Sequence, residues 1–159
     1  MPDLSDALWD INNEYRKRIT QAKGYLTLLE AVIGAHGADP GVRAALRHLR
    51  ATLDAVDADH STWRHTYFYR AHNPLPDYPR MVSRPSDVQR ALRTFSQMLG
   101  QHLRRFDSIV QAMDALPRPD PALTRVIKGN DLWQLCRDEI EQLATYDHYA
   151  QGRLPRRVR

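Results

Sequence analysis

The sequence predicts an all-α protein, a four-helix bundle of long helices. Apolar residues recur at steps of three and four along almost the whole chain, which is the spacing of one helix face. Prolines gather between these stretches, where they would interrupt a helix. No segment combines alternating β-branched residues with a hairpin turn pair, so we expect no strands.

The first two helices are predicted by apolar stripes with recognisable start and stop signals. The first stripe consists of Leu8, Ile11, Tyr15, Ile19, Ala22, Leu26, Leu29 and Ile33. Pro2 and Asp3 favour a helix start before it, and Gly34 favours a stop after it. The second stripe steps by four and three through Val42, Leu46, Leu49, Leu53, Val56, His60, Trp63 and Tyr67. Asp39 and Pro40 supply an N-cap and a first-turn proline, and the unbroken steps are typical of coiled-coil packing.

A proline-rich connector separates the second helix from the third. Residues 73–85 hold four of the ten prolines, so the second helix should end near His72. Ser86 to Gln89 has the pattern of a capping box, and a third apolar stripe then runs to about Leu116. At about 3.3 Å per residue the connector could traverse a long helix, so both up-down-up-down and up-up-down-down orders stay open.

The fourth helical region is predicted to be kinked or broken near Gly129. Asp120 and Pro121 have the chemistry of a cap and a first helical residue. Gly129 interrupts the pattern, and a restart is expected at Asp131. Apolar residues then continue at helical spacing to about Ala150.

Length and composition predict one soluble domain. The chain has 159 residues, of which we expect 1–152 to form a single helical bundle and 153–159 a basic C-terminal tail. The single cysteine, Cys136, excludes an internally disulfide-bonded secreted scaffold. No apolar stretch is long enough to span a bilayer, and the N-terminus lacks a signal-peptide pattern. We therefore expect a cytoplasmic protein without a membrane partner.

Arginine dominates the charge, and the middle of the chain is its basic part. Residues 63–106 carry eight basic and two acidic side chains. Arginine suits bidentate contact with phosphate or carboxylate, and aromatic faces beside it suit stacked bases or a protein hot spot. The candidate binding residues are Arg64, Phe68, Tyr69, Arg70, Tyr78, Arg80, Arg84, Arg90, Arg93, Arg104 and Arg105. The alternative is a solvated helix face, with Phe68 and Tyr69 packed under the connector.

Catalytic and metal motifs are missing from the sequence. It contains no GxxxxGK[ST], GxGxxG, HExxH, GxSxG or CxxC, so phosphate loops, zincin sites, serine-hydrolase elbows and dithiol pairs have no support. Asp57 and His60 have the i, i+3 spacing of carboxylate-bridged metal bundles, but the further ligands of such sites are missing. We interpret His60 as a buried histidine that specifies helix register, held by a carboxylate or a backbone carbonyl. His102, one turn after Met98, could ligate haem but is expected at the edge of its stripe.

One spacing resembles a known family. Arg43 and His48 are similar to the Arg-x4-6-His motif of HEPN-type ribonucleases, which are also helical. Two such residues arise easily in an arginine-rich helix, and a solvated face explains them as well. The stripe of this helix turns His48 outward, where it could act only across a dimer interface.

These observations predict a non-catalytic helical subunit or adaptor. We expect it to dock onto a larger protein or ribonucleoprotein assembly through the arginine and aromatic residues, with no cofactor and no metal. The alternative is an enzyme or a cofactor- or metal-binding bundle with a site around Asp57, His60 and His102. A third interpretation makes the apolar seams partly intermolecular, so that the chain forms a homo-oligomer.

Overall fold

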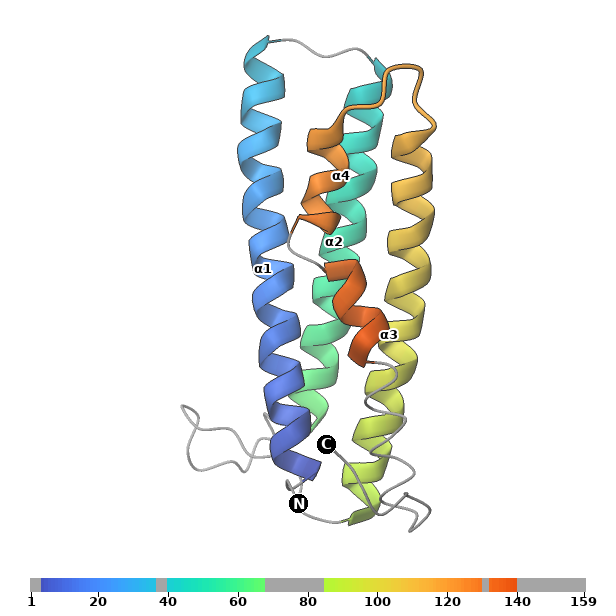
Figure 1. The fold of residues 1–159 in the computed structure, drawn as a ribbon. Helices are drawn as coiled ribbons and strands as arrows, with labels where there is room; N and C mark the ends of the chain where they lie inside the picture. Colours follow the sequence, from blue (N-terminus) through green and yellow to red (C-terminus); the bar gives the residue numbers. More distant parts are fainter. Residues whose placement is uncertain (1–3, 37–39, 68–84, 130–131, 140–159) are drawn as a thin grey trace.

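The chain forms four helical regions in up-down-up-down order (Figure 1). The computed structural model describes residues 4–36, 40–67, 85–129 and 132–139, and all regular structure in these ranges is helical. The helices are α1 (Leu4–His36), α2 (Pro40–Tyr67), α3 (Pro85–Asp114) and α4 (Pro121–Lys128). Residues 132–139 form a further helical stretch after α4. The predicted all-α bundle is confirmed, and the order left open by the sequence is decided.

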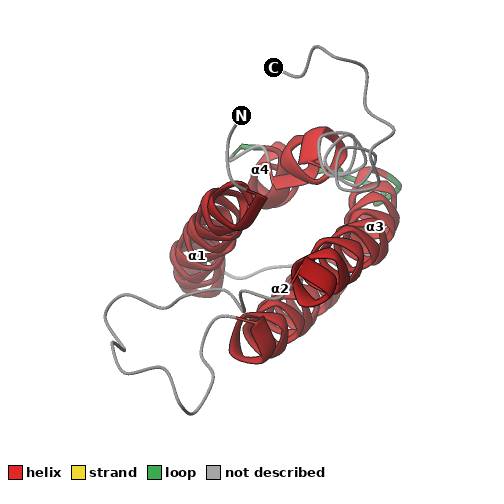
Figure 2. Ribbon diagram, turned by 90° about the horizontal axis from the view of Figure 1, so that it is seen from below, coloured by secondary structure: helices red, strands yellow, loops and turns green. Residues whose placement is uncertain are grey.

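The helices form a closed ring when they are viewed along the bundle (Figure 2). Each helix packs against the next one in the sequence, and α4 also packs against α1. Sequential neighbours are antiparallel, which is the arrangement that amphipathic helices adopt when each buries one stripe in a shared core. Two helices on opposite sides of the ring, α1 and α3, also make direct contact.

The predicted apolar stripes line this core. In α1, residues Leu8, Tyr15, Ala22 and Leu26 are fully buried, and in α2 the stripe is buried from Leu46 to Tyr67. Aromatic rings pack together in this core near the C-terminal end of α2. The ring of Phe95 lies edge-on against Trp63 with centroids 4.5 Å apart, and the Trp63 indole N–H donates to the Ala91 carbonyl oxygen at 3.2 Å. The polar edge of this tryptophan is thereby satisfied inside the core.

The fourth helical region starts and breaks at the residues that the sequence indicated. The Asp120 carboxylate accepts the Ala122 backbone N–H at 2.9 Å, and Pro121 follows as the first helical residue. The helix ends at Gly129, whose N–H donates to the Arg125 carbonyl oxygen at 2.8 Å. A Cβ atom at Gly129 would lie only 2.6 Å from that same oxygen, so glycine is required for this close approach.

Several sequence predictions concern residues outside the described ranges. These are the proline-rich connector, the restart at Asp131, the end of the fourth helix near Ala150 and the basic tail 153–159. Among the helices that the structure does describe, none combines the length and the apolar character needed to cross a bilayer.

Replacing Phe95 by alanine should lower the free energy of unfolding by about 3–5 kcal/mol. Phe95 is 0% exposed and contacts the rings of both Trp63 and Tyr15, so its removal leaves a cavity. Urea denaturation followed by circular dichroism measures the change. Gln97→Ala, at an exposed position two residues later, is the control and should change stability by less than about 0.5 kcal/mol. Equal effects of the two substitutions would contradict this core assignment.

Candidate functional site

A chain of hydrogen bonds crosses the core and joins all four helical regions. The carboxylate of Asp59 on α2 accepts from His102 Nε2 on α3 at 3.0 Å. His102 Nδ1 lies 2.7 Å from the hydroxyl oxygen of Tyr15 on α1. The thiol of Cys136, in the helical residues 132–139, donates to that same oxygen at 3.6 Å. We call these four residues the core hydrogen-bond chain; only Asp59 reaches solvent, with 46% of its side chain exposed.

The carboxylate fixes the direction of every hydrogen bond in this chain. Because the carboxylate oxygens of Asp59 accept hydrogen bonds, His102 Nε2 carries the hydrogen and donates it. The neutral imidazole then has a lone pair on Nδ1, which accepts the Tyr15 hydroxyl hydrogen. The tyrosine oxygen in turn accepts from Cys136. Both nitrogens of the buried imidazole are therefore satisfied while the ring is uncharged.

Burial keeps these groups neutral. It lowers the pKa of His102 below the ordinary value, although the hydrogen bond to Asp59 acts in the opposite direction. Burial also raises the pKa of Tyr15 and raises the pKa of the Cys136 thiol to about 12. At neutral pH all three groups are uncharged, which suits a link between helices better than acid–base chemistry.

A second buried pair lies beside the chain. His60 on α2 is 0% exposed, and its Nε2 donates to the side-chain oxygen of Asn12 on α1 at 2.7 Å. Burial, followed by the positive charge of Arg64, lowers the pKa of His60 to about 3. The imidazole packs edge-on against the Tyr15 ring at 5.3 Å. Asn12 Nδ2 and His60 Nδ1 are buried without a hydrogen-bond partner among the described residues.

These positions revise three expectations drawn from the sequence. His60 is buried as predicted, but an asparagine amide holds it in place of a carboxylate or a carbonyl. His102 is fully buried, so its expected place at the edge of the stripe is wrong. Asp57 does not join either histidine, because its carboxylate binds Lys23 at 2.9 Å. Across the described helices, no three histidine, cysteine or carboxylate side chains converge to hold a metal ion.

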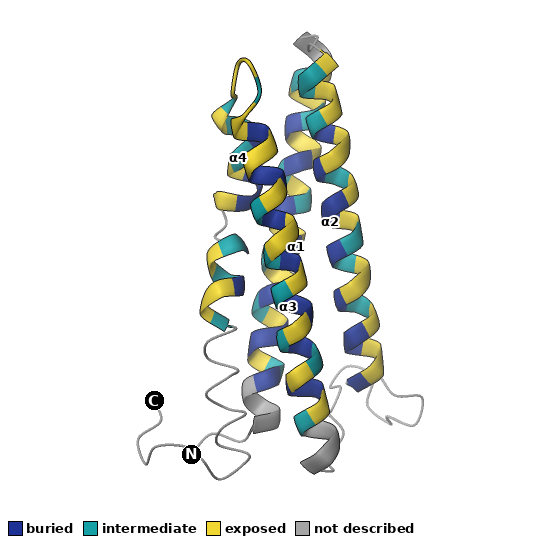
Figure 3. Cartoon of the chain, turned by 90° about the vertical axis from the view of Figure 1, so that its right-hand side faces the viewer, coloured by how far each residue is buried: buried dark blue, intermediate teal, exposed yellow. Residues whose placement is uncertain are grey.

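Arginine is the charged residue at the exposed positions of α3 from residue 90 to 112, where Asp107 is half-buried; the exposed acid Asp114 lies beyond them, at the C-terminal end of the helix. The exposed positions from residue 90 to 112 are Arg90, Arg93, Gln97, Gln101, Arg104, Arg105, Ser108, Gln111 and Ala112. Figure 3 shows the exposed residues along α3, which stands in front in that view. At 1.5 Å per residue the arginines span roughly 22 Å of the helix. We call Arg90, Arg93, Arg104 and Arg105 the basic face.

A groove lies between α2 and α3 next to this face. Its volume is about 590 Å³, and its lining consists of His48, Ala51, Thr52, Gln101, Arg104, Arg105 and Ser108. Ala51 and Thr52 are short, so they leave space opposite the longer side chains of α3. No lining residue is acidic, and neither Arg104 nor Arg105 forms an ion pair with an acid of the described ranges. We call this hollow the α2–α3 groove.

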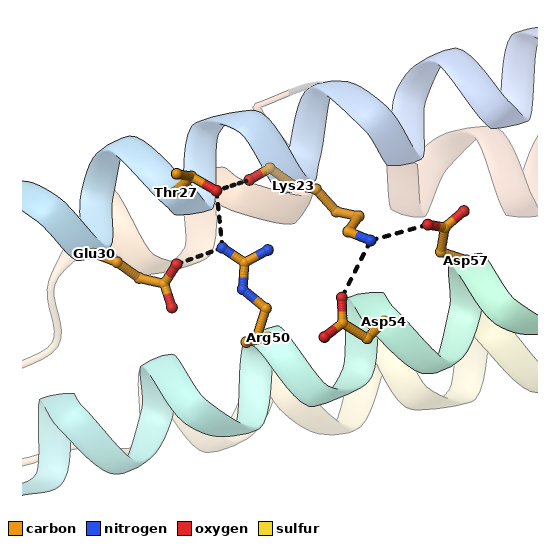
Figure 4. Close-up of polar contacts among 6 residues, drawn as sticks. All are labelled: Lys23, Thr27, Glu30, Arg50, Asp54 and Asp57. Carbon is orange, nitrogen blue, oxygen red and sulfur yellow. Dashed lines mark hydrogen bonds and ion pairs between the residues drawn. The ribbon is translucent and has the colours of Figure 1, made fainter.

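Two of the three acids of α2, Asp54 and Asp57, are held on its other side, against α1 (Figure 4). Lys23 Nζ binds Asp57 at 2.9 Å and Asp54 at 3.2 Å. Arg50 of α2 binds the Glu30 carboxylate of α1. The opposite charges of these two helices therefore compensate each other at the α1–α2 seam and not at the α2–α3 groove.

Two further acids lie on α2 and α3. The Asp59 carboxylate accepts a hydrogen bond from the neutral His102, and Asp107 lies 3.7 Å from Arg137, which follows α4 in the sequence. Neither of these acids forms an ion pair with Arg104 or Arg105. A groove lined by one sign of charge concentrates ions of the opposite sign.

The predicted binding residues fall into three groups. Arg90, Arg93, Arg104 and Arg105 are exposed together on α3. Arg64 is only 9% exposed, because it follows His60 by one turn on the inner side of α2, and its side chain is not part of an open surface. The following predicted residues lie outside the described ranges: Phe68, Tyr69, Arg70, Tyr78, Arg80 and Arg84.

Of the two residues Arg43 and His48, only His48 lines the groove. His48 is exposed, as its place off the apolar stripe predicted, and faces Arg104 and Arg105 across the hollow. Arg43 is exposed on α2 but is not part of the groove lining. The two residues therefore do not form a joint site within this chain.

Sequence reasoning missed most partners in these sites. The spacing of Tyr15 predicts a core residue, but nothing in the spacing shows that its hydroxyl meets His102. Asn12 lies next to Ile11 in the apolar pattern of α1, and a polar residue at such a position is the sequence signal for a buried polar side chain. The neutral groove residues Gln101 and Ser108 carry no sequence signal, because any exposed helix face contains such residues.

Comparison with protein-family models, with curated proteins and with solved structures finds no match to this chain. Its function must therefore be inferred from the geometry and the charge of its own surface.

The free energy of unfolding should fall as the pH falls from 6.5 toward 3. His60 is neutral in the folded state, whereas in the unfolded chain it binds a proton below its ordinary pKa of 6.5. Unfolding therefore takes up a proton in this window, at up to about 1.4 kcal/mol per pH unit, and His102 acts in the same direction. Urea titrations at pH 4.5, 5.5 and 7.5 measure the slope. A His60→Leu variant with the same slope as the unaltered protein would contradict the assignment to His60.

The His60–Asn12 pair predicts a non-additive double-mutant cycle. His60→Leu alone leaves the buried Asn12 amide without its partner and should cost about 1–3 kcal/mol of stability at pH 7.5. Replacing both residues by leucine removes the unsatisfied polar atoms and should restore most of that loss. Urea denaturation of the two single variants and the double variant gives the coupling. Strictly additive losses would show that the two side chains do not depend on each other.

Proposed function

We propose that this chain is a non-catalytic helical subunit that docks onto a larger assembly through the basic face of α3. The supporting observation is that arginines and acids lie on different sides of α3 and of its neighbour α2. Four arginines lie on its exposed side, and the exposed positions between residues 90 and 112 include no acid. Paired acids lie on other sides of α2 and α3. A face with several arginines of like charge is costly for a monomer through self-repulsion and is useful for binding an anionic partner.

The polar cluster in the core supports this proposal over the enzymatic alternative. In the core hydrogen-bond chain, each hydrogen bond of His102 is already used inside the protein. A general base must instead be within hydrogen-bond reach of a substrate proton. His60 faces the aromatic core and Asn12. Neither histidine lines the α2–α3 groove, where an external molecule has access.

The proposal predicts an assembly that depends on the charge of α3. In extract of the native host, the 18.4 kDa chain should elute from a sizing column with a larger assembly at low salt. The variant with Arg90, Arg93, Arg104 and Arg105 replaced by glutamine should elute at the size of the free chain. Because exposed charges act mainly through screened electrostatics, raising the salt should release the unaltered protein as well.

A second variant controls for the change in net charge. It carries glutamine in place of four exposed arginines on other surfaces: Arg16, Arg43, Arg118 and Arg125. We expect this variant to stay with the assembly. Loss of the assembly in both variants, or in neither, would contradict docking through the basic face.

A further inference from the structure

The α2–α3 groove carries a more specific inference, which rests on the proposed function. We propose that this groove binds the phosphodiester backbone of a single-stranded nucleic acid. The ligand chemistry follows from the donors that converge there. Arg104 and Arg105 present two guanidinium groups, and each can bind a phosphate through two parallel hydrogen bonds. Gln101 and Ser108 add a neutral amide and a hydroxyl on the same helix.

The α2 wall of the groove fits a thin, charged chain. Ala51 has no polar side chain, and the Thr52 hydroxyl donates to the His48 carbonyl oxygen at 2.9 Å, so its hydrogen is not free for a ligand. This wall therefore supplies space, while the α3 wall supplies the charge. His48 stands at the rim as a further hydrogen-bonding group.

The lining favours a nucleic-acid backbone over an acidic segment of a protein. Protein hot spots depend on aromatic or large apolar side chains that bury themselves in a pocket. The only apolar side chain in this groove is that of Ala51. Binding to a phosphate backbone needs no such anchor, because release of counterions supplies most of the affinity.

The position of the groove favours a single strand over a duplex. The groove lies along the line where α2 and α3 pack together. The flexible backbone of one strand can follow this line, whereas a rigid double helix can bring only part of its backbone to it. Arg90 and Arg93 continue the same side of α3 beyond the groove, so a strand that leaves it meets further positive charge. Backbone contacts of this kind position the strand without reading its sequence.

Fluorescence anisotropy of the full 159-residue chain tests the proposal. The probes are labelled 15-nucleotide oligouridine and oligothymidine, titrated between 50 and 300 mM salt. We expect either or both probes to bind, with an affinity that falls log-linearly with salt. The variant Arg104→Gln with Arg105→Gln should bind at least about tenfold more weakly and show a salt slope smaller by about 1.4.

The matched control removes the same charge elsewhere. Arg16→Gln with Arg125→Gln changes two exposed arginines on α1 and α4, so its affinity should stay within about twofold of the unaltered protein. Circular dichroism melting curves should be alike for all three proteins, because only exposed side chains change. The proposal is overturned if neither probe binds, if a duplex of equal length binds more tightly, or if the control loses as much affinity as the groove variant.

A polyglutamate peptide separates failure of this inference from failure of the proposed function. If the peptide binds through Arg104 and Arg105 and neither oligonucleotide does, the groove takes an acidic protein. The nucleic-acid inference is then overturned while docking through the basic face is supported. Failure of the proposed function is seen separately, as a host assembly that is unchanged when all four arginines of the basic face are replaced.

Discussion

The hydrogen-bond chain from Asp59 to Cys136 is the interaction on which the bundle geometry depends. It joins α2, α3, α1 and the helical residues 132–139 through three contacts. Apolar stripes alone tolerate sliding by a turn, because leucine against leucine packs similarly in several registers. A buried imidazole that needs a carboxylate on one nitrogen and a hydroxyl on the other does not tolerate it, since any shift leaves buried polar atoms unsatisfied. Specifying register is the best-attested use of a buried polar residue in helical packing.

The same chain influences where the surface charge lies. Asp59 is the acid of α2 nearest to α3, and its carboxylate is turned toward His102. The other two acids of α2 are drawn to Lys23 on α1. The part of α2 that lines the α2–α3 groove therefore carries no acid opposite Arg104 and Arg105. The arrangement of the α2 acids thus has two results. Asp59 satisfies a buried nitrogen of His102, and the α2–α3 groove keeps its positive charge.

The interior and the surface of the bundle have different properties. Inside, neutral histidines and aromatic rings make a core with specific partners, and burial holds the pKa of His60 at about 3. Outside, arginine is the cation that stays charged at any physiological pH and presents flat, bidentate donors. The specific contacts in the interior make the bundle rigid, and the exposed arginines attract anionic groups. Both properties agree with the proposed docking role, because a rigid surface loses little conformational entropy when it binds.

The sequence by itself determined the helices, their buried stripes and the break at Gly129, because apolar spacing, prolines and caps act over a few residues. From the sequence, Arg90, Arg93 and Arg104 can also share a face of the third helix away from its apolar stripe, whereas the structure adds Arg105 to the exposed residues. Only the tertiary structure decided the helix order, the burial of His102 and Arg64, and the partner of each core histidine. Those depend on residues far apart in the chain, such as Tyr15 and His102, whose meeting no local pattern encodes. The α2–α3 groove is also decided only by the tertiary structure, because such a hollow needs two helices that face each other, one of them with short side chains.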